Sequence, residues 1–231
     1  MNKKPLNQKA YGSICHLPNS RLGDGDHKIS EGQAIICLEK ERDYHDTIIV
    51  SEKVDGSNCA VCKIDGKIIP ITRAGYIANT SPYEQHHLFY NWVLENYERF
   101  DELLNEGERV VGEWLALAHG TRYELHHEPF VVFDLMIGNG RVLYLNFLKR
   151  VLKFNFIVPK LISYGKSISH KNILKRLEPS GHGALDHVEG YVCRVERRGQ
   201  VDFLAKWVRA DKEDGKYFKE NYGEDVWNWK P

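Results

Sequence analysis

The dipeptide Asp65-Gly66 separates two short runs of strand-forming residues, 58–63 and 67–72. Asp-Gly between two such runs favours the tight two-residue turn of a β-hairpin. A β-branched run, 47–50, comes shortly before the hairpin and predicts a further strand that leads into Lys53. The first feature of the chain that constrains its fold is therefore a β-hairpin preceded by a strand.

The remaining pattern mixes strands and helices. Further strands are predicted at 34–38, 109–117, 129–136, 188–196 and 201–208, and helices at 81–105, 147–154 and 170–177. Antiparallel hairpins interrupted by helices indicate the α+β class, with antiparallel sheets flanked by helices. No internal repeat, Pro/Ser linker or break in composition divides the sequence. We expect a single domain, 1–231, with a loop-rich leader (1–45), a core (46–209) and a C-terminal tail (210–231).

The composition excludes several classes of protein. Of the 231 residues, 42% are hydrophobic and 11% aromatic, which is enough apolar material for a packed core and excludes a disordered chain. The N-terminus is polar, with Lys3, Lys4 and Lys9, and lacks the apolar run of a signal peptide or a membrane span. We expect a cytoplasmic protein with no membrane partner.

Five cysteines, an odd number, argue against a disulfide framework in such a protein. Cys59 and Cys62 form a CxxC pair, but a zinc site needs a second pair or histidines at ligand spacing, and the other cysteines are single and far apart. Both lie in the apolar run 59–62, where small buried hydrophobic residues are expected. Buried structural thiols are favoured over a metal or redox site.

The charges balance in number but not in position. Thirty-two Lys and Arg residues stand against thirty-two Asp and Glu residues, which is unusual for a protein that binds nucleic acid. No acidic residue occurs between Asp134 and Glu178, whereas this stretch contains nine basic residues: Arg141, Lys149, Arg150, Lys153, Lys160, Lys166, Lys171, Lys175 and Arg176. We expect a positive face; the alternative is a pair of amphipathic helices with solvated lysines.

The segment Glu52-Lys53-Val54-Asp55-Gly56-Ser57-Asn58 places a lysine where a strand enters a tight turn. A lysine amine attacks phosphorus only when unprotonated, and its ordinary pKa of about 10.4 means that nearby cations or a metal must favour the neutral form. Gly56 lets the backbone turn closely beside a nucleotide, and Asp55 can hold the turn by hydrogen bonds to the backbone. The KxDG pattern alone is also typical of a lysine in an exposed turn. Whether Lys53 is a reactive lysine therefore depends on the other motifs of the sequence.

This segment resembles motif I of the covalent nucleotidyltransferases, which comprise ATP-dependent DNA ligases, RNA ligases and mRNA capping enzymes. Later segments resemble the later motifs of these enzymes in the expected order: Arg73 after motif I, Gly112-Glu113 as motif III, Phe133-Asp134 as motif IIIa, Glu189-Gly190-Tyr191-Val192 as motif IV, and 204–209 as motif V. Five ordered motifs are far more specific than one. The resemblance implies the ATP-grasp-like nucleotidyltransferase domain of these ligases.

The resemblance also implies a role for each motif residue. Lys53 takes AMP from ATP as lysyl-AMP, Glu113 contacts the ribose and Phe133 stacks on the adenine. A planar guanidinium suits bidentate phosphate contact and an aromatic face suits stacking. The implied phosphate ligands are Arg73 and Lys206, the implied contact to Mg²⁺ or Mn²⁺ is Glu189, and the nucleotide site is completed by Glu52, Asp55, Gly56 and Asn58.

Motif V departs from the pattern of the family, which carries two lysines separated by one residue. Here Lys206 is followed by Trp207, Val208 and Arg209. Arg209 is a candidate replacement for the second lysine, but it is shifted by one residue. On a strand this shift points a side chain to the opposite face, unless the strand ends or bulges there.

Ser57-Asn58 stands where DNA ligases and capping enzymes commonly place an arginine, so the resemblance is to RNA ligases, in particular those that seal nicked or duplex RNA. It implies an RNA repair enzyme that passes AMP from Lys53 to an RNA 5′-phosphate and joins the 3′-OH end with release of AMP. The stretch 11–18 resembles the leader of compact bacterial and phage RNA-ligase-like proteins. His16 and Arg21 of the leader are candidates for phosphate contact.

Few residues follow Arg209, too few for the OB-fold domain that DNA ligases and capping enzymes append. We expect no C-terminal OB domain and a tail, with Trp227 and Trp229, that folds back on the core. The function of the missing domain would then come from the leader or from a partner protein. Two alternatives stay open: a catalytically silent nucleotide-binding or nucleic-acid-binding relative, and a polynucleotide ligase or guanylyltransferase with a different substrate.

Overall fold

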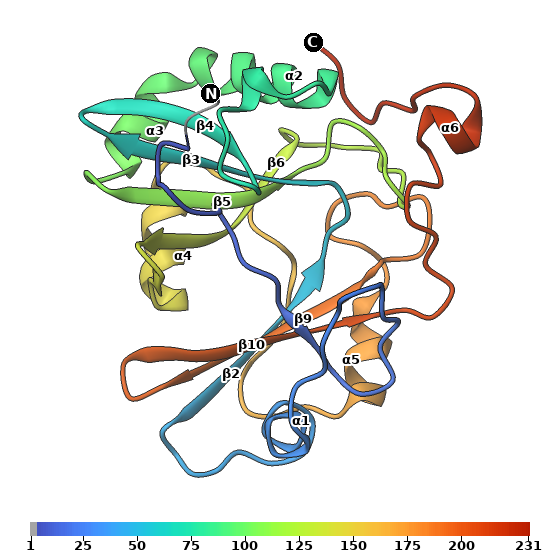
Figure 1. Cartoon of the computed structure of the whole chain (residues 1–231). Coiled ribbons are helices and arrows are strands. Elements are labelled where there is room, and N and C mark those ends of the chain that lie inside the picture. Colours follow the sequence, from blue (N-terminus) through green and yellow to red (C-terminus); the bar gives the residue numbers. More distant parts are fainter. Residues whose placement is uncertain (1–3) are drawn as a thin grey trace.

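The computed structural model describes residues 4–231, and Figure 1 shows two sheets lying one above the other. The upper sheet has the strand order β4-β3-β5-β6-β7 and the lower sheet the order β1-β10-β9-β2-β8. Within these sheets, the one parallel pairing in the described chain is β1 with β10. The strands are β1 Cys15–His16, β2 Asp46–Lys53, β3 Ser57–Ile64, β4 Lys67–Thr72, β5 Glu108–Trp114, β6 Phe130–Ile137, β7 Gly140–Arg141, β8 Leu161–Gly165, β9 Gly190–Arg197 and β10 Gln200–Val208. The α+β prediction is confirmed.

The predicted hairpin is present as β3 and β4. Asp65 and Gly66 both have positive φ, 51° and 68°, as a tight turn between twisted strands requires. Cys59 and Cys62 of β3 are free and buried, and they belong to separate apolar clusters. The prediction that they are buried thiols is therefore confirmed.

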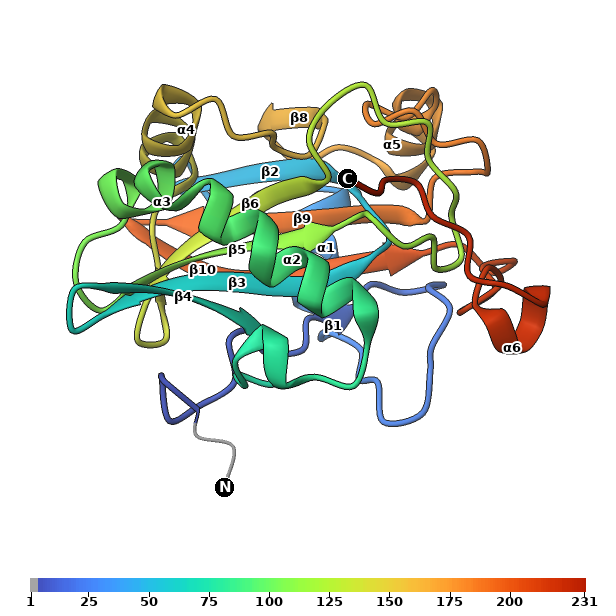
Figure 2. The ribbon, with the colours of Figure 1, turned by 90° about the horizontal axis from the view of Figure 1, so that it is seen from above.

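Two helices cover the upper sheet, and Figure 2 shows α2 crossing over β3 and β5. Phe89 and Trp92 of α2 and Phe100 of α3 pack against Trp114 and Phe130 of the sheet. One continuous helix over 81–105 was the wrong expectation, because α2 ends at an Asn96 cap. The helices of the chain are α1 Glu31–Leu38, α2 Glu84–Glu95, α3 Tyr97–Leu103, α4 Tyr144–Lys153, α5 His170–Leu177 and α6 Lys219–Tyr222, with a 3₁₀ turn at Ala78–Thr80.

The strand expected at 34–38 is instead the end of helix α1. Ser30 caps this helix in a capping box with Gln33, which satisfies free backbone N–H groups at its start. Ala34 and Cys37 bury one face of the helix. The capping box and one-sided burial outweigh the strand preference of the two isoleucines at 35 and 36.

Buried charges join the two sheets. Asp134 of β6 is fully buried and accepts hydrogen bonds from Arg194 of β9 (3.1 Å) and Arg141 of β7 (2.8 Å). Tyr11 of the leader donates to the same carboxylate at 3.2 Å. Asp134, which follows the predicted adenine-stacking residue, thus ties the upper sheet, the lower sheet and the leader together.

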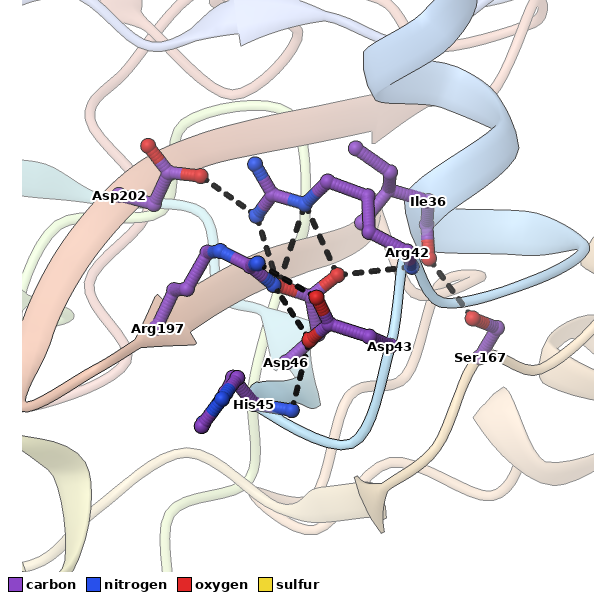
Figure 3. Close-up of polar contacts among 8 residues, drawn as sticks. All are labelled: Ile36, Arg42, Asp43, His45, Asp46, Ser167, Arg197 and Asp202. Atoms are coloured by element: carbon purple, nitrogen blue, oxygen red, sulfur yellow. Dashed lines mark hydrogen bonds and ion pairs between the residues drawn. The ribbon is translucent and has the colours of Figure 1, made fainter.

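A second network of charges holds the far end of the lower sheet (Figure 3). Asp46, at the start of β2, receives hydrogen bonds from Arg42 and Arg197, and its side chain is 0% exposed. Arg197 also binds Asp43, and Arg42 also binds Asp202. These contacts join the loop after α1 to the β9–β10 hairpin.

The tail folds back on the core, as expected. Ala118 donates a backbone hydrogen bond to Val226 (2.9 Å), and Asn228 donates one to Ala116 (2.8 Å). The Trp229 ring packs edge-on against Trp114, with 5.6 Å between ring centroids. In Figure 1 this segment leaves the end of β10 and climbs to the upper sheet.

Candidate active site

Lys53 ends β2 at the point where the chain leaves the lower sheet for the upper one. It lies opposite Gly190 in the β2–β9 pairing, and β3 begins in the upper sheet four residues later. At Gly190 a Cβ atom would lie 1.9 Å from the Trp207 carbonyl oxygen, so the strands can approach this closely only at a glycine. Strand pairing therefore holds the backbone of Lys53 firmly between the sheets.

A cavity of about 180 Å³ opens between the sheets at Lys53. Seven of the predicted site residues line it: Glu52, Lys53, Asn58, Arg73, Glu113, Phe133 and Lys206. The leader contributes Tyr11, Gly12 and Ile14 to the same wall. Residues far apart in the sequence thus converge on one cavity.

Carboxylates surround the Lys53 amine. Its Nζ donates to Glu189, which stands immediately before β9 and is buried. Burial alone would lower the pKa of Lys53, but Glu189, Glu113 and Asp55 outweigh that effect and raise it. The ligand-free site therefore favours the protonated amine, and the cations or metal expected to favour the neutral form stay a prediction for the site with ATP bound.

Glu113 faces Lys53 from β5. Burial raises the pKa of the Glu113 carboxyl group to about 7, against the opposing effect of Lys53. The backbone N–H of Gly56 donates to Glu113 at 3.3 Å, and a Cβ at Gly56 would lie 2.5 Å from the Trp114 carbonyl oxygen. Gly56 therefore allows close packing against the backbone of Trp114, and its approach to a nucleotide stays a prediction.

Asn58 pairs with Glu113 across β3 and β5. Its Oδ1 is buried and accepts no hydrogen bond from any described residue. A buried acceptor without a partner is costly, and it marks a place for a donor from a ligand. Nearby, Phe133 lines the cavity with its ring held edge-on by Tyr11 at 5.3 Å.

Two further cations, Arg73 and Lys206, line the cavity. Arg73 donates to Ser13 of the leader at 3.1 Å, and Lys206 lies 3.7 Å from Asp26. Burial lowers the pKa of Lys206; Asp26 raises it, and Lys53 lowers it further. Both side chains stand where phosphate oxygens would find positive charge.

The structure does not bring Arg209 into the cavity. β10 ends at Val208, and Arg209 pairs instead with Asp211 at 2.5 Å. Leu204, two residues before Lys206, lies on the same side of β10 and lines the cavity. The two strand positions of motif V that face the cavity therefore hold Leu204 and Lys206.

Lys212 of the tail is a site residue that sequence reasoning missed. Its Nζ lies 2.5 Å from Asp55 and 3.8 Å from Glu189, and its side chain is 4% exposed. No motif covers this position. The one signal in the sequence was the absence of the second motif V lysine.

Three other predicted residues have structural partners. The Glu52 carboxylate accepts hydrogen bonds from Ser180 (2.6 Å) and Gly181 (2.8 Å). Glu52 borders the cavity, but its carboxylate holds the loop that contains Ser180 and Gly181. His16 is buried against Asp26 at 2.9 Å, and Arg21 pairs with Asp214 at 2.7 Å. His16 and Arg21, the leader candidates for phosphate contact, are thus paired with carboxylates and do not line the cavity.

Within residues 4–231, no helix combines the length and apolarity needed to cross a membrane. The same residues contain no group of three or more His, Cys, Asp or Glu side chains placed to hold a metal ion by themselves.

The two antiparallel sheets, with a cavity and a strand-end lysine between them, have the fold of RNA ligases of known structure. Variants of the Naegleria gruberi RNA ligase share the fold. One with ATP and Mn has a TM-score of 0.53 and 16% identity, covering 85% of this chain and 60% of that chain. Another variant with ATP and Mn has a TM-score of 0.52 and 16% identity, and the match covers 87% of this chain and 60% of that chain. This chain thus spans about 60% of the length of that ligase.

The RNA ligase family profile matches residues 46–208. The chain belongs to the RNA ligase family. Curated protein sequences give no significant match.

Proposed function

We propose that the chain is an ATP-dependent RNA ligase in which Lys53 forms a covalent lysyl-AMP intermediate. The observation that carries this proposal is the convergence of Lys53, Glu113, Phe133, Arg73 and Lys206 on one cavity. Family membership supports the ligase class. The residue roles come from the geometry of the cavity together with the motif resemblance.

The cavity offers ATP a matching set of groups. Phe133 provides an aromatic face for the base, and the buried Asn58 Oδ1 lacks a donor that a nucleotide can supply. Glu113 can accept a hydrogen bond from a ribose hydroxyl. Arg73 and Lys206 provide positive charge for phosphates.

Three displacements at phosphorus follow from this arrangement. Lys53 Nζ bonds to the α-phosphorus, pyrophosphate leaves with the electron pair of the broken P–O bond, and the Lys53 ammonium gives up two protons to solvent. An oxygen of the RNA 5′-phosphate then displaces Lys53 from AMP, and the amine leaves with the electron pair of the N–P bond and takes up protons from solvent. The 3′-OH finally attacks the activated 5′-phosphate and AMP leaves. Positioning and charge stabilisation carry most of the catalysis in such transfers.

The residues also fit a divalent cation. Mg²⁺ is usually held by one or two carboxylates together with substrate phosphates, and Mn²⁺ accepts similar oxygen ligands. The buried Glu189 and the half-buried Glu113 provide carboxylates beside Lys53, and we assign Glu189 as the metal-facing one. A bound Mg²⁺ or Mn²⁺ would neutralise charge on the phosphoryl oxygens. The two N. gruberi ligase structures were determined with Mn.

The proposed substrate is RNA with a 5′-phosphate and a 3′-OH, as at a nick in a duplex. The leader lines the cavity through Tyr11, Gly12 and Ile14 and would contribute to binding ATP there, and a partner protein is the alternative source of such contacts. The position of Arg209 outside the cavity favours a second candidate, a catalytically silent nucleotide-binding relative.

A sealing assay separates these candidates. Nicked RNA, or nicked DNA of the same sequence, with a labelled 5′-phosphate is incubated with protein, Mg²⁺ or Mn²⁺, and either ATP or GTP, and nucleotide binding and the protein–nucleotide adduct are measured in parallel. We expect sealing with ATP by the wild type and none by Lys53→Ala. Nucleotide binding without sealing or adduct would favour the silent relative, a GTP-dependent adduct would favour a guanylyltransferase, and sealing restricted to DNA would exclude RNA as the substrate.

A further inference from the structure

The tail places a buried lysine behind the reacting amine. Lys212 follows β10, and the Lys212 side chain is 4% exposed. The ammonium contacts Asp55 at 2.5 Å and lies 3.8 Å from Glu189. Burying an ammonium group is costly unless it is paired, and in the part of the chain described here its ion-pair partners are these two site carboxylates.

The surrounding backbone is shaped for this ammonium. A Cβ at Gly120 would lie 2.6 Å from both Cε and Nζ of Lys212, so the lysine passes directly over a glycine. The Gly120 N–H donates to the same Asp55 oxygen at 2.8 Å. Tyr217 of the tail donates a backbone hydrogen bond to His119 at 2.9 Å and keeps the two segments together.

Glu189 lies between two lysines. Its Oε2 accepts from Lys53, and its Oε1 faces Lys212. When Lys53 becomes lysyl-AMP, an N–P bond forms, the P–O bond to pyrophosphate breaks, and pyrophosphate leaves with the electron pair. The Lys53 ammonium gives up two protons to solvent, so its positive charge disappears while a phosphate charge arrives.

That loss would remove one of the two lysine charges that face this pair of buried carboxylates. An uncompensated buried charge is strongly destabilising. We propose that Lys212 is a positioning residue that remains the counter-ion of Asp55 and Glu189 after Lys53 has reacted, and thereby stabilises the adenylylated state. This inference rests on the proposed function, and it makes the C-terminal tail part of the active site.

The equilibrium with pyrophosphate measures this effect directly. Purified adduct is titrated with pyrophosphate at fixed ATP and Mg²⁺, and the concentration that reverses half of the adduct is determined. For Lys212→Gln, which keeps a hydrogen-bond donor but loses the charge, we expect this midpoint to fall about tenfold, equivalent to about 1.4 kcal/mol. Lys212→Arg keeps the charge and should stay near the wild-type midpoint even if adduct forms more slowly.

Lys216→Gln is the matched control, because Lys216 lies in the same tail but pairs with Asp186 and is 39% exposed at its side chain. Its midpoint should equal that of the wild type. The inference would be overturned if folded Lys212→Gln protein had the same pyrophosphate midpoint as the wild type. If Lys212→Gln does not fold, a tenfold fall of the midpoint in Lys212→Arg would overturn it instead. Failure of the wild type to form adduct would instead overturn the proposed function.

Discussion

At the scale of residues, the proposed chemistry depends on Lys53, whose amine faces the carboxylates of Glu189, Glu113 and Asp55. The motif resemblance identifies Lys53, Glu113, Phe133, Arg73 and Lys206, and the structure places all five on one cavity. Resemblance cannot show that carboxylates raise the pKa of Lys53 in the ligand-free site, because that depends on distances across two sheets. Lys212, the ion-pair partner of Asp55, belongs to the tail and lies in none of the motifs.

Gly190 gives a prediction at this scale. Gly190→Ala puts a methyl group 1.9 Å from the Trp207 carbonyl oxygen and forces β9 away from β10, next to Lys53. We expect the free energy of unfolding in urea to fall by about 3 kcal/mol, the upper range for overpacking. Gly32→Ala is the control, since no atom lies within 4 Å of its added Cβ and helix α1 should gain about 0.5–1 kcal/mol. Equal stability of the two variants would contradict the account.

At the scale of elements, the network around Asp46 fastens the start of β2, the strand that carries Lys53. Burial alone would raise the pKa of Asp46, but hydrogen bonds from Arg42 and Arg197 outweigh it and lower the pKa to about 2. A carboxyl group with a lower pKa in the folded state stabilises the fold above its unfolded pKa of about 3.9, and this contribution is lost as pH falls through about 2. The network should therefore weaken in acid.

Asp46→Asn tests this element. At pH 7 we expect the variant to lose about 2 kcal/mol of unfolding free energy relative to the wild type, and the gap to narrow as the pH is lowered from 4 toward 2. Urea unfolding at several pH values measures the gap. Asp24→Asn, at an exposed leader position, should show almost no gap at any pH. A difference in unfolding free energy between wild type and Asp46→Asn that stays constant from pH 7 to pH 2 would show that the charge of Asp46 does not stabilise the fold.

The sequence predicted most elements but not those set by distant contacts. The strands leading to and from the Lys53 turn follow from local β preference and the Asp65-Gly66 turn. Helix α1 was misassigned as a strand because its capping box outweighed two β-branched residues. β8 was missed because a five-residue edge strand has little pattern of its own and forms by pairing with β2.

At the scale of the whole molecule, two sheets, a leader and a tail enclose one site. Asp134 joins the sheets through Arg194 and Arg141, and the leader and tail each contribute a side of the site. The chain has no net formal charge, so the proposed RNA binding would depend on local charge. Within the basic stretch, Arg150 of α4 pairs with Glu108 at 2.6 Å and serves the fold.

Lys149 and Lys153 of α4 are exposed and remain candidates for RNA contact. Lys149→Ala combined with Lys153→Ala should weaken RNA binding and flatten its salt dependence by about 1–2 in the slope of log K against log salt, while leaving adenylylation intact. Binding is measured across a salt series. Lys67→Ala combined with Lys219→Ala, two exposed lysines elsewhere, is the control. An unchanged slope in the α4 variant would mean that these lysines only solvate a helix.

The central claim is that Lys53 carries AMP. Protein incubated with ATP and Mg²⁺ is analysed by intact mass, then digested, and the modified peptide is sequenced. The account predicts one AMP per chain, linked to Lys53 and absent from Lys53→Ala. AMP on another lysine, or an adduct that persists in Lys53→Ala, would contradict it.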